Sequence, residues 1–550
     1  MNYEKYKRFE TIKLKDRTWP DKTIEKAPIW CSVDLRDGNQ ALITPMKIEE
    51  KVEMFQLLVD LGFKEIEVGF PSSSQIEYDF LRLLIEENLI PDDVTVQVLT
   101  QAREHLIRKT FEALKGLDKA IVHVYNSTSI LQRDVVFNKD KDEIKQIAID
   151  GVQLVKDLSK EFEGKVILEY SPESFTGTEV DYAMEVCEAV MDTWGASKDN
   201  KVIINLPSTV EMDTPNVYAD QIEWMCRNFK DRERVIVSVH PHNDRGCGIA
   251  STELALLAGA DRVEGTGNVD VVTVALNMFT HGVDPQLELG SINDIKHVYE
   301  KCTKMDIPPR HPYVGQLVFT AFSGSHQDAI NKGMHALRER NSKMWEVPYL
   351  PIDPSDLGRQ YEPIVRINSQ SGKGGVAYVM ESMYGYHLPK GLQVDFAKVI
   401  QDISEEEGEV SPERVYDTFI EQYVDIKEPY EFIKQKLIDI SEDDSEFERK
   451  AEITLKDHGE IRTIVGYGNG PIDAVKDAFN ENGFVYTHFL DYSEHSLSSG
   501  SSSKAAAYVY LRVKGSAVQE YGVGVHPNIT TATIKAIISA MNRIHKQLKK

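Results

Sequence analysis

The sequence has 550 residues and a net charge of −25, from 63 lysines and arginines against 88 aspartates and glutamates. So acidic a chain repels the phosphates of nucleic acids and of anionic membranes, and we expect neither as a partner. The five scattered cysteines, the lack of an apolar signal segment at the N-terminus, and the lack of an apolar run near the ~18 residues of a membrane span indicate a protein of the reducing cytoplasm.

Eight short segments rich in valine and isoleucine follow one another in the first half of the chain, with helical patterns between them. Apolar residues recur at helical spacing in 48–61, 180–194 and 217–229. Strands that alternate with helices form a parallel sheet that is covered on both faces. Eight such units fit a closed α/β TIM barrel better than an open doubly wound sheet. The predicted strands are 29–37, 64–70, 95–101, 120–127, 165–173, 201–209, 234–244 and 262–265.

The alternation stops near residue 285. Residues 286–440 look mainly helical, and the acidic run 441–448 precedes a region with strands and two helices. We therefore predict a TIM-barrel domain over 1–285, helical linker subdomains over 286–440 and an α+β domain over 441–550. Within the last domain, 464–479 and 520–538 both read strand, GxGxxP and helix, which is typical of a pseudo-symmetric pair.

Polar side chains gather where the predicted strands end, and TIM-barrel enzymes hold their catalytic groups there. His240 and His242 are two residues apart on strand seven, so both imidazoles point to the same side. Asp37 ends strand one, and would complete a site of two histidines and one carboxylate with open positions for a substrate. Mg²⁺ is favoured there, with Mn²⁺ or Zn²⁺ as alternatives. Asp244 is a weaker candidate ligand, and a merely polar strand end is the alternative interpretation.

A divalent ion with two adjacent open positions suits a 2-oxo acid, because the carboxylate and ketone oxygens can bind it together. The ion then polarises the ketone carbon. Arg36 adjoins Asp37 and could neutralise the alkoxide that forms when the ketone is attacked. An ion pair with Glu67 is the alternative role for Arg36.

At these residues the chain resembles the 2-isopropylmalate synthase family over nearly its whole length. The resemblance implies a catalytic TIM barrel, linker subdomains that contribute to the active site, and a C-terminal regulatory domain that binds leucine and dimerises. The implied reaction condenses acetyl-CoA with 2-oxoisovalerate to give 2-isopropylmalate and CoA. Homocitrate and citramalate synthases share the RDG and HxH motifs, so another 2-oxo acid is the alternative. The matching segments include DLRDGNQAL, GFKEIEVGFP, VHVYNSTS, LEYSPESFTGTE, INLPSTVEMDTPNVYAD, VHPHNDRG, FSGSHQDAINKG, VPYLPIDPSDLGR and GYGNGPIDA.

The resemblance also implies roles for individual residues. Asn268 would lie near the metal that Asp37, His240 and His242 hold. The residues around the oxo acid would be Arg36, Glu67, His123, Ser171 and Thr209, with Glu173 beside them. The catalytic groups would be Arg36, Glu173, His326 and Tyr349, the last two reaching from the linker region over the barrel of the same or the partner subunit, and His326 serving as an acid or base. A homodimer with leucine as allosteric inhibitor is expected, and the leucine site would involve Gly468, Asn469, Gly470, Pro471, Asn528 and Ile529.

One departure from the family bears on activity. After strand eight the family has the form EGTLFGNGERTGNV, whereas this chain reads EGTGNV over 264–269. A loop of two or three residues is normal between a strand and a helix, so the barrel can close without the roughly eight missing residues. Their loss predicts impaired use of acetyl-CoA with metal and oxo-acid binding retained, and leaves a catalytically impaired homologue as an alternative function.

Overall fold

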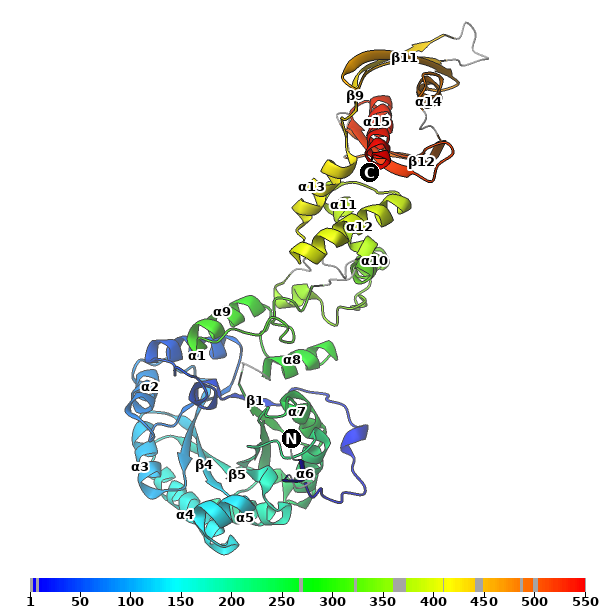
Figure 1. The fold of residues 1–550 in the computed structure, drawn as a ribbon. Coiled ribbons are helices and arrows are strands. Elements are labelled where there is room, and N and C mark those ends of the chain that lie inside the picture. Colours follow the sequence, from blue (N-terminus) through cyan, green and yellow to red (C-terminus); the bar gives the residue numbers. More distant parts are fainter. Residues whose placement is uncertain are drawn as a thin grey trace. The chain divides into compact units, whose positions relative to one another are not determined.

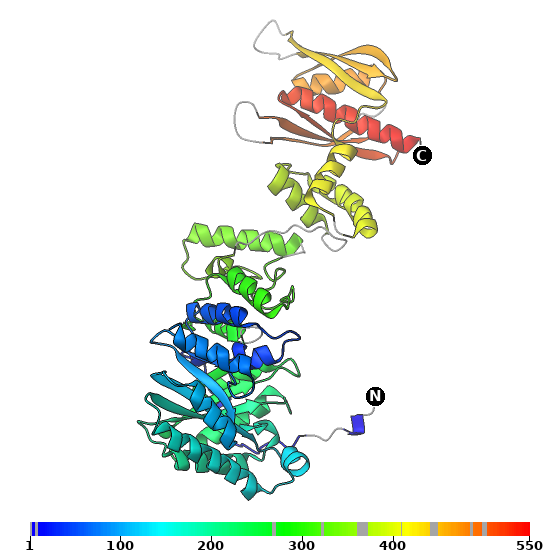
Figure 2. The same cartoon turned by 90° about the vertical axis from the view of Figure 1, so that its left-hand side faces the viewer.

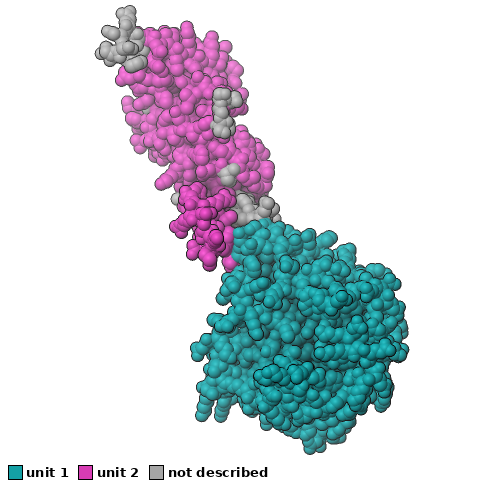
Figure 3. Space-filling view, turned by 180° about the vertical axis from the view of Figure 1, so that it is seen from behind, with its two compact units in different colours: residues 1–319, 352–361 teal, residues 320–351, 362–550 magenta. Residues whose placement is uncertain are grey.

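The computed structural model describes residues 3–5, 9–266, 271–320, 324–359, 372–408, 410–440, 449–484, 488–497 and 503–549. It divides the chain into two compact units, coloured separately in Figure 3. Unit 1 comprises residues 1–319 and 352–361, and unit 2 comprises residues 320–351 and 362–550. The division into three domains at residues 285 and 440 stays a prediction beside this two-unit arrangement.

Unit 1 contains a closed barrel of eight parallel strands in sequence order, which confirms the predicted fold. Figure 1 shows the strands as an inner ring with helices outside it. The strands are β1 (Ile29–Ser32), β2 (Glu65–Gly69), β3 (Thr95–Gln101), β4 (Lys119–Ser127), β5 (Lys165–Glu173), β6 (Val202–Ser208), β7 (Val235–Pro241) and β8 (Arg262–Gly265). The helices are α1 (Ile48–Asp60), α2 (Gln75–Glu86), α3 (Glu104–Ala113), α4 (Lys141–Ser159), α5 (Val180–Trp194), α6 (Pro215–Asn228), α7 (Gly248–Leu257), α8 (Val271–Thr280) and α9 (Ile292–Thr303).

The first strand is shorter than the sequence pattern predicted. β1 ends at Ser32, and Asp34–Gly38 form one π-helical turn. The amides of Arg36, Asp37 and Gly38 all donate to the Val33 carbonyl oxygen, over 3.1, 2.9 and 3.1 Å. Because these three amides bond to one carbonyl within the turn, the chain leaves the sheet after β1. Asp37 therefore lies on a turn after the strand.

Unit 2 begins with helices, and its C-terminal region, from residue 430 to residue 548, consists of two similar halves. Its helices are α10 (Gly324–Arg340), α11 (Gly372–Tyr384), α12 (Lys390–Glu407) and α13 (Pro412–Tyr423). The first half contains β9 (Tyr430–Asp439), β10 (Arg449–Asp457), β11 (Glu460–Gly468) and α14 (Pro471–Glu481). The second half contains β12 (His488–Ser496), β13 (Ala505–Arg512), β14 (Gln519–His526) and α15 (Ile529–Leu548).

Each of these two halves is a three-stranded antiparallel sheet followed by a helix. In both views α14 and α15 lie between the two sheets, and their apolar residues share one buried core with both (Figures 1 and 2). β9 ends before residue 441 yet pairs with β10, so the first sheet starts upstream of the predicted boundary. Within the described part of the chain, no helix is long and apolar enough to span a membrane.

Candidate functional site

The three predicted metal ligands meet at one end of the barrel. Asp37 Oδ2 lies 3.3 Å from His240 Nε2 and 3.6 Å from His242 Nε2. The two imidazole centres are 5.4 Å apart. One donor atom from each residue lies within 4.8 Å of the other two, which places two nitrogens and one oxygen around a common point. This donor set is one that divalent transition ions and Mg²⁺ accept.

The charges around these ligands favour a cation. Burial alone would raise the pKa of Asp37, but hydrogen bonds from His240 and His242 and the charge of Arg36 hold it well below its usual range. Burial alone would lower the pKa of His240, but hydrogen bonds to Asp37 and Glu264 raise it to about 9. The carboxylates that stabilise an extra proton here also stabilise a bound metal ion, so the residues fit the predicted site.

The other predicted ligands are placed differently. Asp244 Oδ2 accepts a hydrogen bond from the amide of Glu211 (3.1 Å), so this carboxylate organises the neighbouring loop. Asn268 lies outside the described residues, and its predicted role stays a prediction. Sequence reasoning missed Glu264, whose Oε2 lies 3.0 Å from His240 Nδ1 and orients that ring toward the site.

A second acid–histidine group lies deeper in the barrel but has no room for an ion. Glu67, His123 and Glu264 also bring donor atoms within 4.8 Å of one another. The amide nitrogen of Gln97 occupies their centre, 2.7 Å from Glu67 Oε2 and 2.9 Å from Glu264 Oε1. The Gln97 carbonyl oxygen accepts from Arg262 (2.7 Å), which fixes the direction of the amide. Gln97 thus takes the place of a cation.

Polar groups line the path from the metal ligands to the end of β5. Arg36 Nε donates to Glu67, and the other carboxylate oxygen of Glu67 lies 2.8 Å from His123 Nδ1. His123 Nε2 is 2.7 Å from Ser171 Oγ, which also accepts from Asn205 (3.0 Å). Four residues that the sequence assigned to the oxo acid are therefore connected. The ion pair of Arg36 with Glu67, the alternative role, is present as well.

Burial would lower the pKa of Arg36, but the charges of Glu67 and Asp37 outweigh burial and raise that pKa. Arg36 therefore stays cationic beside the metal ligands. The two remaining predicted residues sit at the neighbouring strand ends. Thr209 Oγ1 accepts from the amide of Ser174 (3.0 Å), and Glu173 accepts from Ser127.

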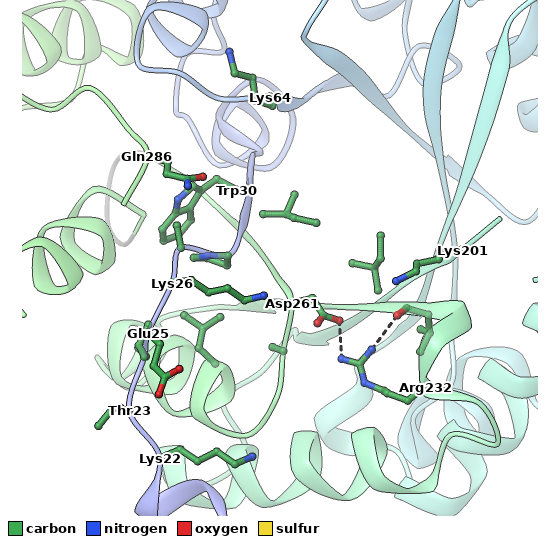
Figure 4. A pocket seen from close by; sticks show the side chains of 18 of the residues that line it. Lys22, Thr23, Glu25, Lys26, Trp30, Lys64, Lys201, Arg232, Asp261 and Gln286 are labelled. Atoms are coloured by element: carbon green, nitrogen blue, oxygen red, sulfur yellow. Dashed lines mark hydrogen bonds and ion pairs between the residues drawn. The ribbon is translucent and has the colours of Figure 1, made fainter. Parts of the chain in front are cut away.

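A cavity of about 370 Å³ borders the metal ligands. Asp37, His240, His242 and Glu264 line it together with apolar side chains of β8, α8 and Met305. A larger cavity of about 1150 Å³ lies at the other end of the barrel, where the strands begin (Figure 4). There Lys26 and Arg232 are directed toward Asp261, which pairs with Arg232 over 2.6 Å. TIM-barrel chemistry sits where strands end, so the smaller cavity is the candidate site.

Family models cover most of the chain. Residues 27–298 match the HMGL-like family, 316–381 the alpha-isopropylmalate synthase post-catalytic domain-like family, and 409–545 the LeuA allosteric (dimerisation) domain. A 2-isopropylmalate synthase from Clostridium acetobutylicum is 58% identical, and one from Agrobacterium fabrum is 56% identical, each over 99% of this chain and 99% of the relative. The chain belongs to the 2-isopropylmalate synthase family.

Two residues that the resemblance assigned to catalysis in this family lie in unit 2. His326 on α10 stacks on Tyr349, with ring centres 4.1 Å apart and planes 27° apart. Tyr349 has a positive φ of 65° and is 61% exposed. A non-glycine residue held in this conformation with an exposed ring is unusual. The pair forms a flat, accessible surface, and its catalytic role stays a prediction.

The residues predicted for leucine binding in the 2-isopropylmalate synthase family occupy equivalent places in the two halves. Gly468 ends β11, Gly470 precedes α14, and Pro471 is its first residue. Asn528 caps α15 by accepting from the Thr531 amide (2.9 Å), and Ile529 is the first residue of that helix. Both sets, with Asn469, therefore lie at a strand-to-helix junction.

Proposed function

We propose that this chain condenses acetyl-CoA with 2-oxoisovalerate to give 2-isopropylmalate and CoA, the first committed step of leucine biosynthesis. The observation that carries the proposal is the meeting of Asp37, His240 and His242 beside the linked side chains of Arg36, Glu67, His123 and Ser171. Membership of the family supports the same reaction.

The donor set fits a divalent cation, for which we propose Mg²⁺, with Mn²⁺ and Zn²⁺ as alternatives. Asp37, His240 and His242 would hold it, and it would supply Lewis-acid polarisation of the ketone. Glu264 fixes the orientation of His240 through its contact with Nδ1 (3.0 Å).

The side chains around the metal ligands suit the oxo acid. Arg36 is cationic, and its Nη1 donates to Asp37. We propose that it stabilises the negative charge that develops on the ketone oxygen. His123 and Ser171 form a hydrogen-bonded pair that can bind the carboxylate of the oxo acid, with Thr209 at the adjacent strand end.

The second substrate needs a base, because the α-proton of a thioester is a weak acid. The carbanion of acetyl-CoA forms the new carbon–carbon bond to the ketone carbon, the alkoxide takes up a proton, and water then cleaves the thioester to release CoA. We propose His326 for proton transfer, with Tyr349 stacked on it, and Glu173 as the carboxylate beside the oxo acid.

A CoA-release assay tests the proposal. The chain is supplied with acetyl-CoA and a series of 2-oxo acids, with Mg²⁺ or with EDTA, and the product is identified by mass. We expect 2-isopropylmalate from 2-oxoisovalerate and loss of activity in EDTA. Oxo acids that differ by one methylene should react about 10–200-fold less well, because an apolar pocket discriminates that group by only ~1–3 kcal/mol.

Two aspartates provide matched variants for the same assay. Asp37→Asn changes a proposed ligand and should lower kcat by roughly 100-fold or more. Asp244→Asn changes an acidic neighbour that holds the Glu211 amide and should retain most of the activity. Equal effects of the two variants would contradict the ligand assignment. Binding of metal and 2-oxoisovalerate without CoA release would identify the impaired homologue that the short loop after Gly265 suggested.

We further propose a homodimer in which leucine acts as allosteric inhibitor, supported by the LeuA allosteric (dimerisation) domain match over 409–545. A cytoplasmic location, expected from the sequence, stays a prediction.

A further inference from the structure

A lysine is completely buried behind the turn that carries Arg36 and Asp37. Lys51 lies on α1, and its side chain is 0% exposed. Its ammonium group forms an ion pair with Glu77 of α2 and lies 5.1 Å from the centre of the Phe80 ring. Lysine is rarely found fully buried, and a buried ammonium needs compensation for the hydration that it loses.

The ion pair contacts both the turn that carries Asp37 and the end of the neighbouring strand β2. Lys51 Nζ lies 3.5 Å from the carbonyl oxygen of Leu35, the second residue of the Asp34–Gly38 turn. Glu77 Oε2 accepts a hydrogen bond from the amide of Phe70 (3.2 Å), directly after β2. On the other side, Arg36 joins the same two elements, because it donates to Glu67 of β2.

A glycine makes room for this contact. Gly69, the last residue of β2, has a φ of +155°, and a Cβ placed on it would come within 2.0 Å of Glu77 Oε2. The carboxylate can therefore lie against the backbone only because this residue has no side chain. The Gly69 backbone, the Glu77 carboxylate, the Lys51 ammonium and the Leu35 carbonyl form a continuous series of contacts from the end of β2 to the turn.

Stability alone does not require such a pair. Replacing a buried ion pair by apolar side chains of similar size is often neutral or stabilising, because desolvation offsets most of the attraction. A charged pair does fix direction, since it can hold backbone polar groups such as the Leu35 carbonyl and the Phe70 amide, which apolar side chains cannot.

We propose that Lys51 and Glu77 are positioning residues for the metal site. Together they hold the Asp34–Gly38 turn against the end of β2 and so fix Asp37 and Arg36 in the places where they serve the cation and the oxo acid. This inference rests on the proposed function for the identity of the ligands, but it concerns the geometry of the free site.

The test measures metal affinity without turnover. Mn²⁺ is titrated into the full-length chain, and free Mn²⁺ is followed by electron paramagnetic resonance. The double variant Lys51→Met/Glu77→Leu replaces the pair by apolar side chains and should raise the Mn²⁺ Kd by about 10–100-fold, the range seen when groups that orient metal ligands are lost. The single variant Lys51→Arg keeps the charge, and its Mn²⁺ Kd should lie between those of the wild type and the double variant.

The control changes an ion pair on the same helix that does not reach the turn. Glu53 of α1 pairs with Lys301 of α9 over 2.6 Å at the surface, and Glu53→Gln/Lys301→Gln should leave the Mn²⁺ Kd unchanged. If the apolar double variant does not fold, Glu77→Gln, which keeps the shape of the side chain, replaces it and should raise the Kd by a smaller factor. A folded variant without the charged pair that binds Mn²⁺ as the wild type does overturns the inference.

Kinetic constants separate this inference from the proposed function. If the chain binds Mn²⁺ but releases no CoA, the proposed reaction fails and the titration still tests Lys51 and Glu77. If CoA is released, the apolar variant should raise the KM for 2-oxoisovalerate and lower kcat, whereas the KM for acetyl-CoA should change little. A general loss of structure would instead lower the amount of active protein with both KM values unchanged, which would count against a positioning role.

Discussion

Two buried glutamates inside the barrel lie beside the same arginine but differ in their hydrogen bonds. Glu264 contacts Arg262 (2.8 Å), Gln97 and His240. Burial alone would raise the pKa of Glu264, but the charge of Arg262 and the hydrogen bond from His240 hold it well below the usual range. Glu169 is also fully buried, with Arg262 3.4 Å and His123 3.6 Å from its oxygens, but neither oxygen has a hydrogen-bond partner among the described residues. Burial raises the pKa of Glu169 well above the usual range and, with the negative charge of Glu264, outweighs the charge of Arg262, so we infer that this carboxyl is neutral.

Glutamine should therefore be tolerated at one position and not at the other. Glu264→Gln removes one partner of a buried ion pair and should cost about 3 kcal/mol, since the charge of Arg262 is then only partly compensated. Glu169→Gln replaces one neutral group by another and should not lower stability, because at neutral pH only the unfolded wild-type chain gains from ionising this carboxyl. Thermal unfolding of the two variants at neutral pH measures the difference. Equal losses would show that Glu169 is ionised in the folded chain.

The neutral state of Glu169 also predicts a pH dependence. In the unfolded chain this carboxyl loses its proton near pH 4.3, whereas the folded chain keeps the proton to a much higher pH. The folded state then binds more protons, so this group lowers stability as the pH rises above about 4.3, by ~1.4 kcal/mol per unit until the folded pKa is reached. Glu169→Gln removes that slope. The unfolding temperature of the variant should rise relative to wild type between pH 5 and pH 8, and a constant difference would refute the assignment.

At the scale of elements, the sequence predicted the barrel because eight apolar strands carry a periodic signal. The Asp34–Gly38 turn gives no such signal, since one turn is too short to show periodicity. The sequence pattern therefore places Asp37 on a strand, whereas it lies on this turn. The inward groups Arg262 and Glu264 were missed as a pair, although their spacing of two residues along β8 points both into the barrel. Two charged residues at a spacing of two in so short a strand could have predicted an inward-facing ion pair.

The repeated GxG motif has a packing role that the sequence did not reveal. A Cβ on Gly522 would lie 2.2 Å from the Ala536 carbonyl oxygen of α15, and a Cβ on Gly466 would lie 2.0 Å from the Ala478 amide nitrogen of α14. These glycines let each helix lie directly on its sheet. They are therefore required by the close approach of two backbones.

Alanine at this contact should separate the helix from the sheet. Gly522→Ala puts a methyl group into backbone atoms that cannot move independently, and we expect a loss of about 3 kcal/mol in the stability of unit 2. Gly470→Ser is the matched control, because a Cβ there meets no atom within 4 Å and serine is a good residue before a helix. Chemical denaturation followed by circular dichroism compares the two. A destabilised Gly470→Ser with an unaffected Gly522→Ala would reverse the argument.

At the scale of the whole molecule, the candidate residues divide between two units. Metal ligands and oxo-acid groups lie in unit 1, whereas His326, Tyr349 and the residues predicted for leucine binding lie in unit 2. Strand periodicity could predict the first set, because a closed barrel brings its strand ends together. It could not predict the second, since the placement of a surface histidine or tyrosine depends on tertiary contacts that leave no periodic pattern.

This division leads to a prediction about leucine. If leucine binds at the strand-to-helix junctions of unit 2 and inhibits a reaction in unit 1, the two sites share a coupling free energy, and the coupling is the same in both directions. Millimolar L-leucine should then lower the rate of CoA release and raise the unfolding temperature of unit 2.

Calorimetric titration should find that 2-oxoisovalerate weakens leucine binding by the factor by which leucine weakens oxo-acid binding. D-leucine has the same composition and apolar area, and should change neither the rate of CoA release nor the unfolding temperature. Leucine that stabilises the chain without changing oxo-acid affinity would show a binding domain uncoupled from the barrel, and leucine with no effect on either would remove the proposed regulation.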